Sequence, residues 1–418
     1  MNQNASTQRP RARKRSSILF RAVGIATVSA LALVLAACGG SSSDTASGSK
    51  APIKVMTWAP INSQLTNYPA IKGAAQTYEK YINAKGGIAG HKLQVLFCDE
   101  KGDPTAAANC ARQAIQEKAT AVVGSFGYTG DATIPLLKGA NIAIFGGCCS
   151  NSVADLTSSN AFIMGDGPTY GAALAQKAVD DGKKKISLVV VDGAQTYQVP
   201  VENALKANGL KLNKSVVLPA TAQDLSPQAA QALNGGTDAV VIVAGSDSIK
   251  SFMTAYVQTG SKARIYGPQG NLTEDVAKDF KTQLEGAVTG NTYPDISSPV
   301  WDDFRAALTK YNAPDISYNG LDGLGTWAAY TAFKNITESI NGTIDSKSFL
   351  DTASKATNVD TAGMTAPIDF SKEWTDGPKG YDRLFNRTAV FGTFKDGKLV
   401  PIDSDFKDYS NLMLGKPE

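Results

Sequence analysis

The chain has 418 residues, 43% of them hydrophobic and 8% aromatic, which is enough apolar material for more than one folded domain. Its 41 Lys and Arg residues against 38 Asp and Glu residues give a formal net charge of +3. This balance excludes the strongly basic class of nucleic-acid-binding proteins.

Residues 1–37 have the order of a secretory signal peptide. Basic residues come first, and an apolar run of about 14 residues follows from Ala22 to Leu35, shorter than the roughly 20 residues of a membrane-spanning helix. The run ends in Ala36-Ala37-Cys38, which resembles the lipobox of bacterial lipoproteins. We therefore predict that processing leaves a lipid on Cys38 and anchors an extracytoplasmic protein to the cell membrane.

Residues 38–51 are rich in Gly, Ser, Thr and Ala and are predicted to be a flexible tether. All six basic residues of the first 37 are lost with the signal peptide, so the processed chain has 35 basic and 38 acidic residues and a net charge of −3. The basic excess thus belongs to the signal peptide, and the folded body has no basic patch for nucleic acid.

Four cysteines remain after Cys38, and an even number outside the cytoplasm indicates disulfide bonding. Three pairings are possible. We favour Cys98–Cys110, which would join the end of a strand to the following helix. Cys148 and Cys149 are adjacent and form either a vicinal disulfide or two thiols. The only histidine, His91, lies in a glycine turn, so neither a metal nor a cofactor is predicted.

The body alternates β-branched runs with amphipathic helices, the pattern of an α/β fold. A helix with apolar residues from Ile71 to Ile82 follows the first strand, and a second helix opens with Asp103-Pro104, a cap residue before an N1 proline. The same order restarts at a run from Ile186 to Val191 that is typical of a buried parallel strand. The predicted strands are 53–58, 93–97, 121–124, 142–145, 186–191, 216–218, 239–243 and 264–266.

The last third departs from this alternation. Helices are predicted over 299–311, 321–341 and 346–356, followed by a hairpin of 388–394 and 398–400 around Asp396-Gly397. These segments are expected to return and complete two doubly wound parallel-sheet lobes. Ligands of such sheets bind beyond the carboxyl ends of the strands, so the residues after each strand matter most.

The run from Ile82 to Leu93 resembles the "INxxGGIxGxKL" stretch of the leucine/isoleucine/valine-binding proteins. The acidic turn from Asp99 to Ala106, the strand 121–124 and the loop 266–270 resemble later parts of that family in the same order. The resemblance implies a type I periplasmic-binding fold, with two lobes, three hinge crossovers and closure on a small ligand. The crossovers are expected near 166–169, 291–296 and 365–368. They divide the body into a first lobe of 52–167 plus 296–365 and a second of 168–295 plus 366–418.

The resemblance also implies a ligand site. In the first lobe, Tyr68 matches a cleft tyrosine, and two loops match those that hold a carboxylate with backbone N–H groups and hydroxyls. The first loop is Gly127, Tyr128 and Thr129, and the second is Cys148, Cys149 and Ser150. The second lobe is expected to contribute Tyr197, Ser246, Asp247 and Gln269, and the late helix Asp322.

Several of these residues also have a structural interpretation. Tyr68 and Tyr197 could be surface or core aromatics, Gly127 could serve a tight turn, and Asp247 or Asp322 could cap a helix. Gln269 is neutral where the family has a glutamate that meets the ligand ammonium, so an amino acid would need Asp247 or Asp322 as its acidic partner. Amides, urea and aromatic acids therefore stay open as solutes.

The resemblance predicts a solute-capturing lipoprotein of an ABC importer that works as a monomer with a permease and its ATPase subunits. The alternative is a ligand sensor that signals through a partner protein. An enzyme is not predicted, because the sequence has no G-x-S-x-G elbow, no phosphate-binding loop and no histidine placed as a base.

Overall fold

The computed structural model of the protein describes residues 50–63, 67–147, 152–165, 167–192, 194–219, 222, 224–402 and 405–417. Residues from Ser49 onward form one compact unit. The predicted signal peptide, its lipidation site Cys38 and the residue trio Cys148, Cys149 and Ser150 lie outside the described residues.

The first sheet is parallel, with the strand order β2-β1-β3-β4-β5. Side chains of β1 alternate between two cores: Val55 faces one hydrophobic cluster, whereas Met56 and Trp58 face the other. The strands are β1 Lys50–Ala59, β2 His91–Asp99, β3 Ala121–Val123, β4 Ala143–Phe145 and β5 Ala161–Phe162.

Helices connect these strands as the sequence pattern predicts. Asp103 caps α2, because its side chain accepts a hydrogen bond from the Ala106 N–H, and Pro104 is the first helical residue. The predicted disulfide is confirmed: Cys98 of β2 is bonded to Cys110 of α2, with their Cα atoms 5.7 Å apart. The helices are α1 Pro69–Ala84, α2 Pro104–Gln116, α3 Gly130–Gly139 and α4 Val153–Thr157.

The second sheet has the order β12-β11-β10-β9-β8-β6-β7, with β13 paired to β11. It is mixed, because β6 to β10 run parallel whereas β11 and β12 pair antiparallel as the predicted hairpin. Its strands are β6 Ile186–Val191, β7 Ser215–Leu218, β8 Ala239–Val243, β9 Arg264–Pro268, β10 Val288–Asn291, β11 Thr388–Lys395, β12 Lys398–Pro401 and β13 Lys407–Asp408. The accompanying helices are α5 Gly167–Asp180, α6 Gln198–Ala207, α7 Ser226–Leu233, α8 Ser246–Thr259, α9 Glu274–Asp279, α10 Lys281–Leu284 and α14 Ser410–Met413.

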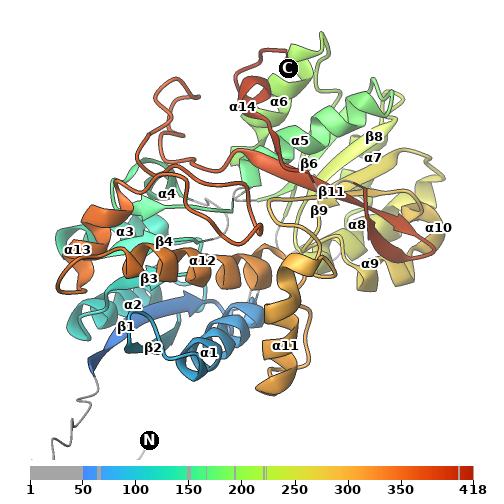
Figure 1. Ribbon diagram of the computed structural model, residues 1–418. Helices are drawn as coiled ribbons and strands as arrows, with labels where there is room; N and C mark the ends of the chain where they lie inside the picture. Colours follow the sequence, from blue (N-terminus) through green and yellow to red (C-terminus); the bar gives the residue numbers. More distant parts are fainter. Residues whose placement is uncertain are drawn as a thin grey trace, which may run out of the picture. The chain divides into compact units, whose positions relative to one another are not determined.

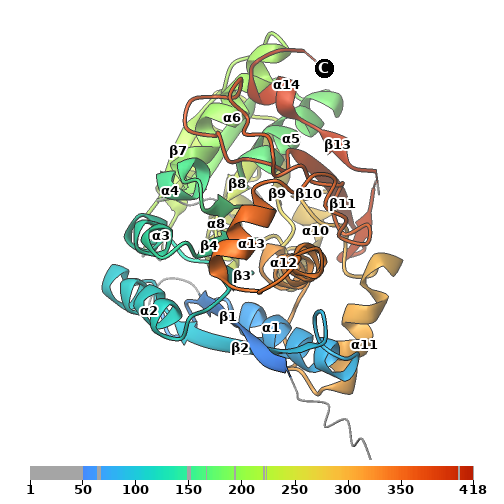
Figure 2. The same cartoon turned by 60° about the vertical axis from the view of Figure 1, so that its left-hand side comes forward.

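Three late helices, α11 Asp302–Lys310, α12 Leu321–Glu338 and α13 Ser346–Ala353, return to the first sheet. In Figures 1 and 2, α12, drawn in orange, lies beside α1, drawn in blue. Both helices pack against the face of the sheet that carries Val55. The predicted α/β fold of two doubly wound units is therefore confirmed, with a chain that leaves the first sheet and comes back to it.

The predicted position of the third crossover, near 365–368, is wrong. Phe370 packs against Phe145 and Phe162 of the first sheet, with ring centroids 5.4 and 5.6 Å apart. Leu384 forms a parallel bridge with Ile163. The stretch 366–386, assigned by sequence to the second lobe, thus lies on the first sheet, and the chain enters the second sheet only at β11. The segment lacks the apolar periodicity by which a packed element is recognised in sequence.

Candidate functional site

The helix α12 crosses close to the carboxyl ends of β3 and β4. A Cβ atom at Gly124 would come within 3.0 Å of Thr326, and one at Gly146 within 2.3 Å of the Ala329 Cβ. The Thr326 hydroxyl donates a hydrogen bond of 2.8 Å to the Gly124 carbonyl. Both glycines have positive φ, so they serve the turn after each strand as well as the close approach of α12.

An aromatic cluster of Tyr68, Phe126 and Tyr128 lies at this edge of the first sheet. The Tyr68 and Phe126 ring centroids are 4.3 Å apart, and Phe126 meets Tyr128 edge-on at 5.0 Å. The Tyr68 and Tyr128 hydroxyls are 2.9 Å apart and share a hydrogen bond. Tyr128 remains 41% exposed, so part of its surface is accessible. The structure thus brings together Tyr68 and Tyr128, whereas Phe126 was not predicted.

A buried acid, Glu100, directly follows β2 and was also missed. Its carboxylate accepts hydrogen bonds from the Gly102 N–H at 3.2 Å and from the Thr129 hydroxyl at 3.2 Å. It also lies against Gly127, 3.5 Å from the position that a Cβ atom would take there. Burial raises the pKa of Glu100, and its two donors act in the opposite direction. The predicted loop residues Gly127 and Thr129 therefore contact a buried carboxyl group.

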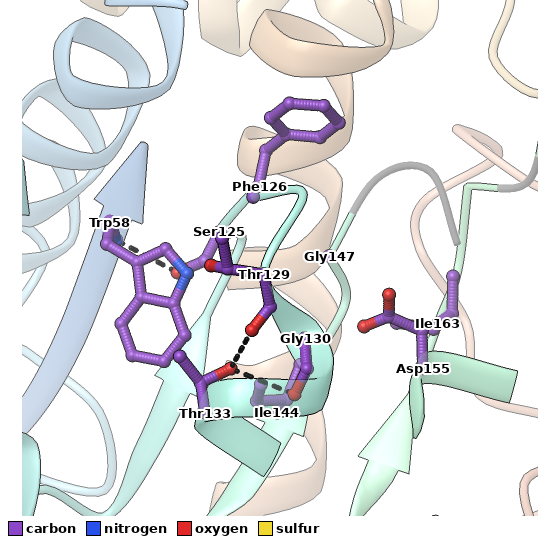
Figure 3. Close-up of a pocket in the computed structure, with 11 residues that line it drawn as sticks. Trp58, Ser125, Phe126, Thr129, Gly130, Thr133, Ile144, Gly147, Asp155 and Ile163 are labelled. Atoms are coloured by element: carbon purple, nitrogen blue, oxygen red, sulfur yellow. Dashed lines mark hydrogen bonds between the residues drawn. The ribbon is translucent and has the colours of Figure 1, made fainter. Parts of the chain in front are cut away.

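Figure 3 shows a hollow behind this loop, bordered by Trp58, Thr133 and Asp155 among others. Its volume is about 20 Å³, which corresponds to about one water molecule. Ser125 fixes the loop to β1, because its Oγ accepts a hydrogen bond of 3.0 Å from the Trp58 N–H. The Phe126 side chain points away from the hollow. The hollow therefore lies among the residues that hold the loop in place and is too small for a solute.

The predicted residues after β6 and β8 occupy different environments. Tyr197, in a 3-10 helix of Gln195–Tyr197, is 6% exposed and shares a hydrogen bond with the Tyr170 hydroxyl. It has the packing of a core residue beside Gly167, where a Cβ atom would come within 1.9 Å of its hydroxyl. The Ser246 hydroxyl donates to the Asn271 carbonyl. Asp247 is exposed in the first turn of α8.

Gln269 follows β9 and is 3% exposed. Its Nε2 donates to Asn319 Oδ1 at 2.9 Å, and the Asn319 amide in turn donates to Asp295 Oδ2 at 2.6 Å. Next to this pair the backbones of Gly270 and Gly320 meet, since a Cβ atom at Gly270 would lie 2.9 Å from the Gly320 Cα. Gln269 therefore connects the second sheet to the segment that leads into α12.

Asp322 lies in the first turn of α12 and is half-buried. Burial raises the pKa of Asp322, and the N–H groups of its own backbone and of Gly323 lower it in part. A negative charge at this position is also favoured by the helix dipole. No salt bridge among the described residues includes Asp322. Asp322 and Gln269 thus flank the same Gly270–Gly320 contact.

Residues 64–382 match the family described as periplasmic binding protein. The chain belongs to the periplasmic binding protein family. Members of this family bind solutes, and the protein is not an enzyme. In the part of the chain that the structure describes, no helix is long and apolar enough to cross a membrane, and no group of three or more metal-ligating side chains occurs.

Individual relatives show the breadth of this family. The chain is 25% identical over 259 residues to Leu/Ile/Val-binding protein homolog 4 of Brucella abortus, a match that spans 57% of this chain and 60% of the relative. A fatty acid ABC transporter substrate-binding protein from Thermomonospora curvata superposes with a TM-score of 0.72 at 17% identity, over 87% of this chain and 94% of that one. An R. palustris solute-binding protein in complex with 4-hydroxybenzoate gives a TM-score of 0.70 at 17% identity, over 86% and 97% of the two chains.

Proposed function

We propose that this periplasmic binding protein is the solute-binding lipoprotein of an ABC importer. It would capture a small polar solute, an amino acid or a related amide or carboxylate, between the carboxyl edges of its two sheets and deliver it to a permease with ATPase subunits. The family match across 64–382 carries this proposal. The solutes in the names of its relatives, branched-chain amino acids, fatty acids and 4-hydroxybenzoate, all have a carboxylate.

The first sheet supplies donors suited to that carboxylate. The loop that begins at Gly127 leads into α3, so its N–H groups and the positive end of the helix face the same region. Tyr68 and Tyr128 add hydroxyls and ring surface beside it. Closure of the second sheet on the solute would then be a population shift, stabilised by contacts to both sheets.

Gln269→Ala and Asp322→Ala are each expected to weaken solute affinity by about tenfold or more, roughly 1.4 kcal/mol. Gln269→Ala would release Asn319 from its hydrogen bond, and Asp322→Ala would remove the acid at the start of α12. Isothermal titration calorimetry with a solute found by screening measures both effects. Asp351→Ala, on the exposed face of α13, is the matched control and should leave the affinity unchanged. Unchanged affinity in both site variants would show that Gln269 and Asp322 are not part of the solute site.

Cys38→Ala is expected to release the protein from the membrane fraction, because the lipid of a lipoprotein is attached to that cysteine. Fractionation followed by immunoblotting measures the released share. A Cys148→Ala variant should stay in the membrane fraction and controls for the general effect of losing a cysteine. Retention of the Cys38→Ala protein with the membranes would contradict lipid anchoring.

Solute capture itself is tested by thermal shift on residues 39–418, with a panel of amino acids, short amides, urea, and aromatic and aliphatic carboxylates. A solute at 100 times its dissociation constant stabilises the native state by about 2.7 kcal/mol. If a branched-chain amino acid stabilises the protein most, Asp247 or Asp322 would have to bind the ammonium group that the family's glutamate binds. A preference for amides or carboxylates would instead assign the altered specificity to Gln269. A panel with no stabilising member would count against solute import of these classes.

A further inference from the structure

Glu100 is an unusual residue for the support of a binding loop, because a carboxyl group is costly to bury in its charged form. The side chain is 0% exposed. It touches the loop at two points, through the Thr129 hydroxyl and along Gly127, and the Gly102 N–H holds its other oxygen. The carboxyl group thus lies directly under the loop whose N–H groups are proposed to face the solute.

Among the residues that the structure describes, no cation is paired with this acid. None of the salt bridges within the described ranges includes Glu100. Two further acids, Asp99 and Asp103, flank it in sequence, and both raise the pKa of Glu100 further.

The elements that follow the loop carry two more acids. Asp131 is exposed in the first turn of α3, and Asp155 of α4 lies against Gly130. The only nearby cation in sequence, Lys101, is exposed and points its backbone N–H at Asp99. Burial and the neighbouring Asp99 and Asp103 therefore raise the pKa of Glu100, and the Gly102 and Thr129 donors offset part of this rise.

We propose that Glu100 is a positioning residue of the solute loop and that the protein takes up a proton at Glu100 when it binds a solute carboxylate. This inference rests on the proposed function, since it requires a solute at the loop. In the neutral form Glu100 still accepts from Thr129 and Gly102, so the loop keeps its geometry. In the ionised form its charge would lie just behind Gly127 and oppose a second negative charge on the loop.

Two consequences follow by linkage. At pH values above the pKa of Glu100 in the solute-free protein, affinity for a carboxylate should fall by about tenfold per pH unit, because a proton must be bound together with the solute. Below that pKa the proton is already present, and affinity should be independent of pH. An uncharged solute should show neither effect.

The first measurement needs no solute. Unfolding by urea is followed from about pH 4.5 to about pH 8 for the native sequence and for Glu100→Gln. Glutamine preserves the shape, its amide oxygen can accept from the Gly102 N–H, and its amide nitrogen can donate to the Thr129 hydroxyl. A raised pKa in the folded state means that the folded protein holds a proton that the unfolded chain has lost. The stability of the native sequence relative to Glu100→Gln should therefore be fully present below the ordinary pKa of 4.5 and decline as pH rises through the raised value. A difference that stays constant over this range overturns the proposal.

The second measurement is calorimetric, with benzoate and L-leucine as carboxylate probes and benzamide as the uncharged probe. Titrations in buffers of different ionisation enthalpy give the number of protons taken up. For the native sequence this number should approach one for a carboxylate as pH rises above the pKa of Glu100, and it should be zero for Glu100→Gln and for benzamide. Proton uptake that persists in Glu100→Gln, or a carboxylate bound without uptake at any pH, overturns the proposal. If benzamide binds and no carboxylate binds at any pH, the proton-uptake proposal is overturned, but solute capture still stands. If no member of the wider panel binds, the result counts against the proposed function itself.

Discussion

Replacing Arg383 with methionine is expected to lower the free energy of unfolding by about 3–5 kcal/mol. Arg383 is 4% exposed, and its guanidinium group lies 4.6 Å from the ring centroids of both Phe162 and Phe385. It donates to the carbonyl oxygens of Ala161 and Ser159 and to the carboxylate of Glu373. Methionine fills much of the volume but removes the Arg383 hydrogen bonds to the buried carbonyl of Ala161 and to the partly buried one of Ser159.

Urea denaturation followed by circular dichroism measures this effect. Glu373→Gln is the matched control, because the Glu373 side chain is 47% exposed and its ion pair is expected to contribute less than about 1 kcal/mol. The loss of stability for Arg383→Lys should lie between the losses for Arg383→Met and Glu373→Gln, since lysine keeps the charge but cannot reach all three acceptors at once. A loss for Arg383→Met no larger than that for Glu373→Gln would show that the stretch 366–386 is not held to the first sheet by this residue.

Gly146→Ala is expected to cost about 3 kcal/mol or more. The new methyl group would lie 2.3 Å from the Cβ and 2.9 Å from the Cα of Ala329, so α12 would have to move away from the first sheet. The backbone at Gly146 also has φ of +66°, which is unfavourable for alanine. The combination of a close contact and a strained backbone makes this the most sensitive glycine at the site.

The two contributions can be separated. Gly260 has φ of +67°, and a Cβ atom there would meet nothing within 4 Å, so Gly260→Ala reports the backbone strain alone, about 1 kcal/mol. Adding Ala329→Gly to Gly146→Ala should recover part of the lost stability, because it removes the Ala329 methyl group with which the new side chain would clash. Thermal unfolding of the three variants checks this order. Equal losses for Gly146→Ala and Gly260→Ala would mean that α12 adapts without cost.

The two sheets could be predicted from the sequence because buried parallel strands are apolar runs separated by capped helices. Ile186 to Val191 and the Asp103-Pro104 helix start are local signals, and the structure confirms both. The stretch 366–386 has no such signal. Its position depends on single long-range contacts, such as Arg383 with Ala161 and Leu384 with Ile163, and these leave no periodic pattern.

Part of the candidate site could likewise be predicted from the sequence, and part could not. Tyr68, Gly127, Tyr128 and Thr129 are brought to one edge of the first sheet, where the resemblance to a known family placed them. Glu100 could have been found from its place directly after a parallel strand, which is where ligands of such sheets bind. The partner of Gln269 could not, because Asn319 is 50 residues away and no local pattern relates the two.

The path of the chain also fixes the order in which the protein can fold. The helix α12 and the stretch that contains Arg383 belong to the core around the first sheet, yet they are synthesised after strands β6 to β10 of the second sheet. A nascent chain that stops before α12 has the strands of the first sheet and α1, but it lacks the helix that packs beside α1 on the same face. Its first half therefore lacks contacts that come from residues distant in sequence, and we expect the complete fold to form slowly. Slow folding would leave the chain extended for longer after its synthesis.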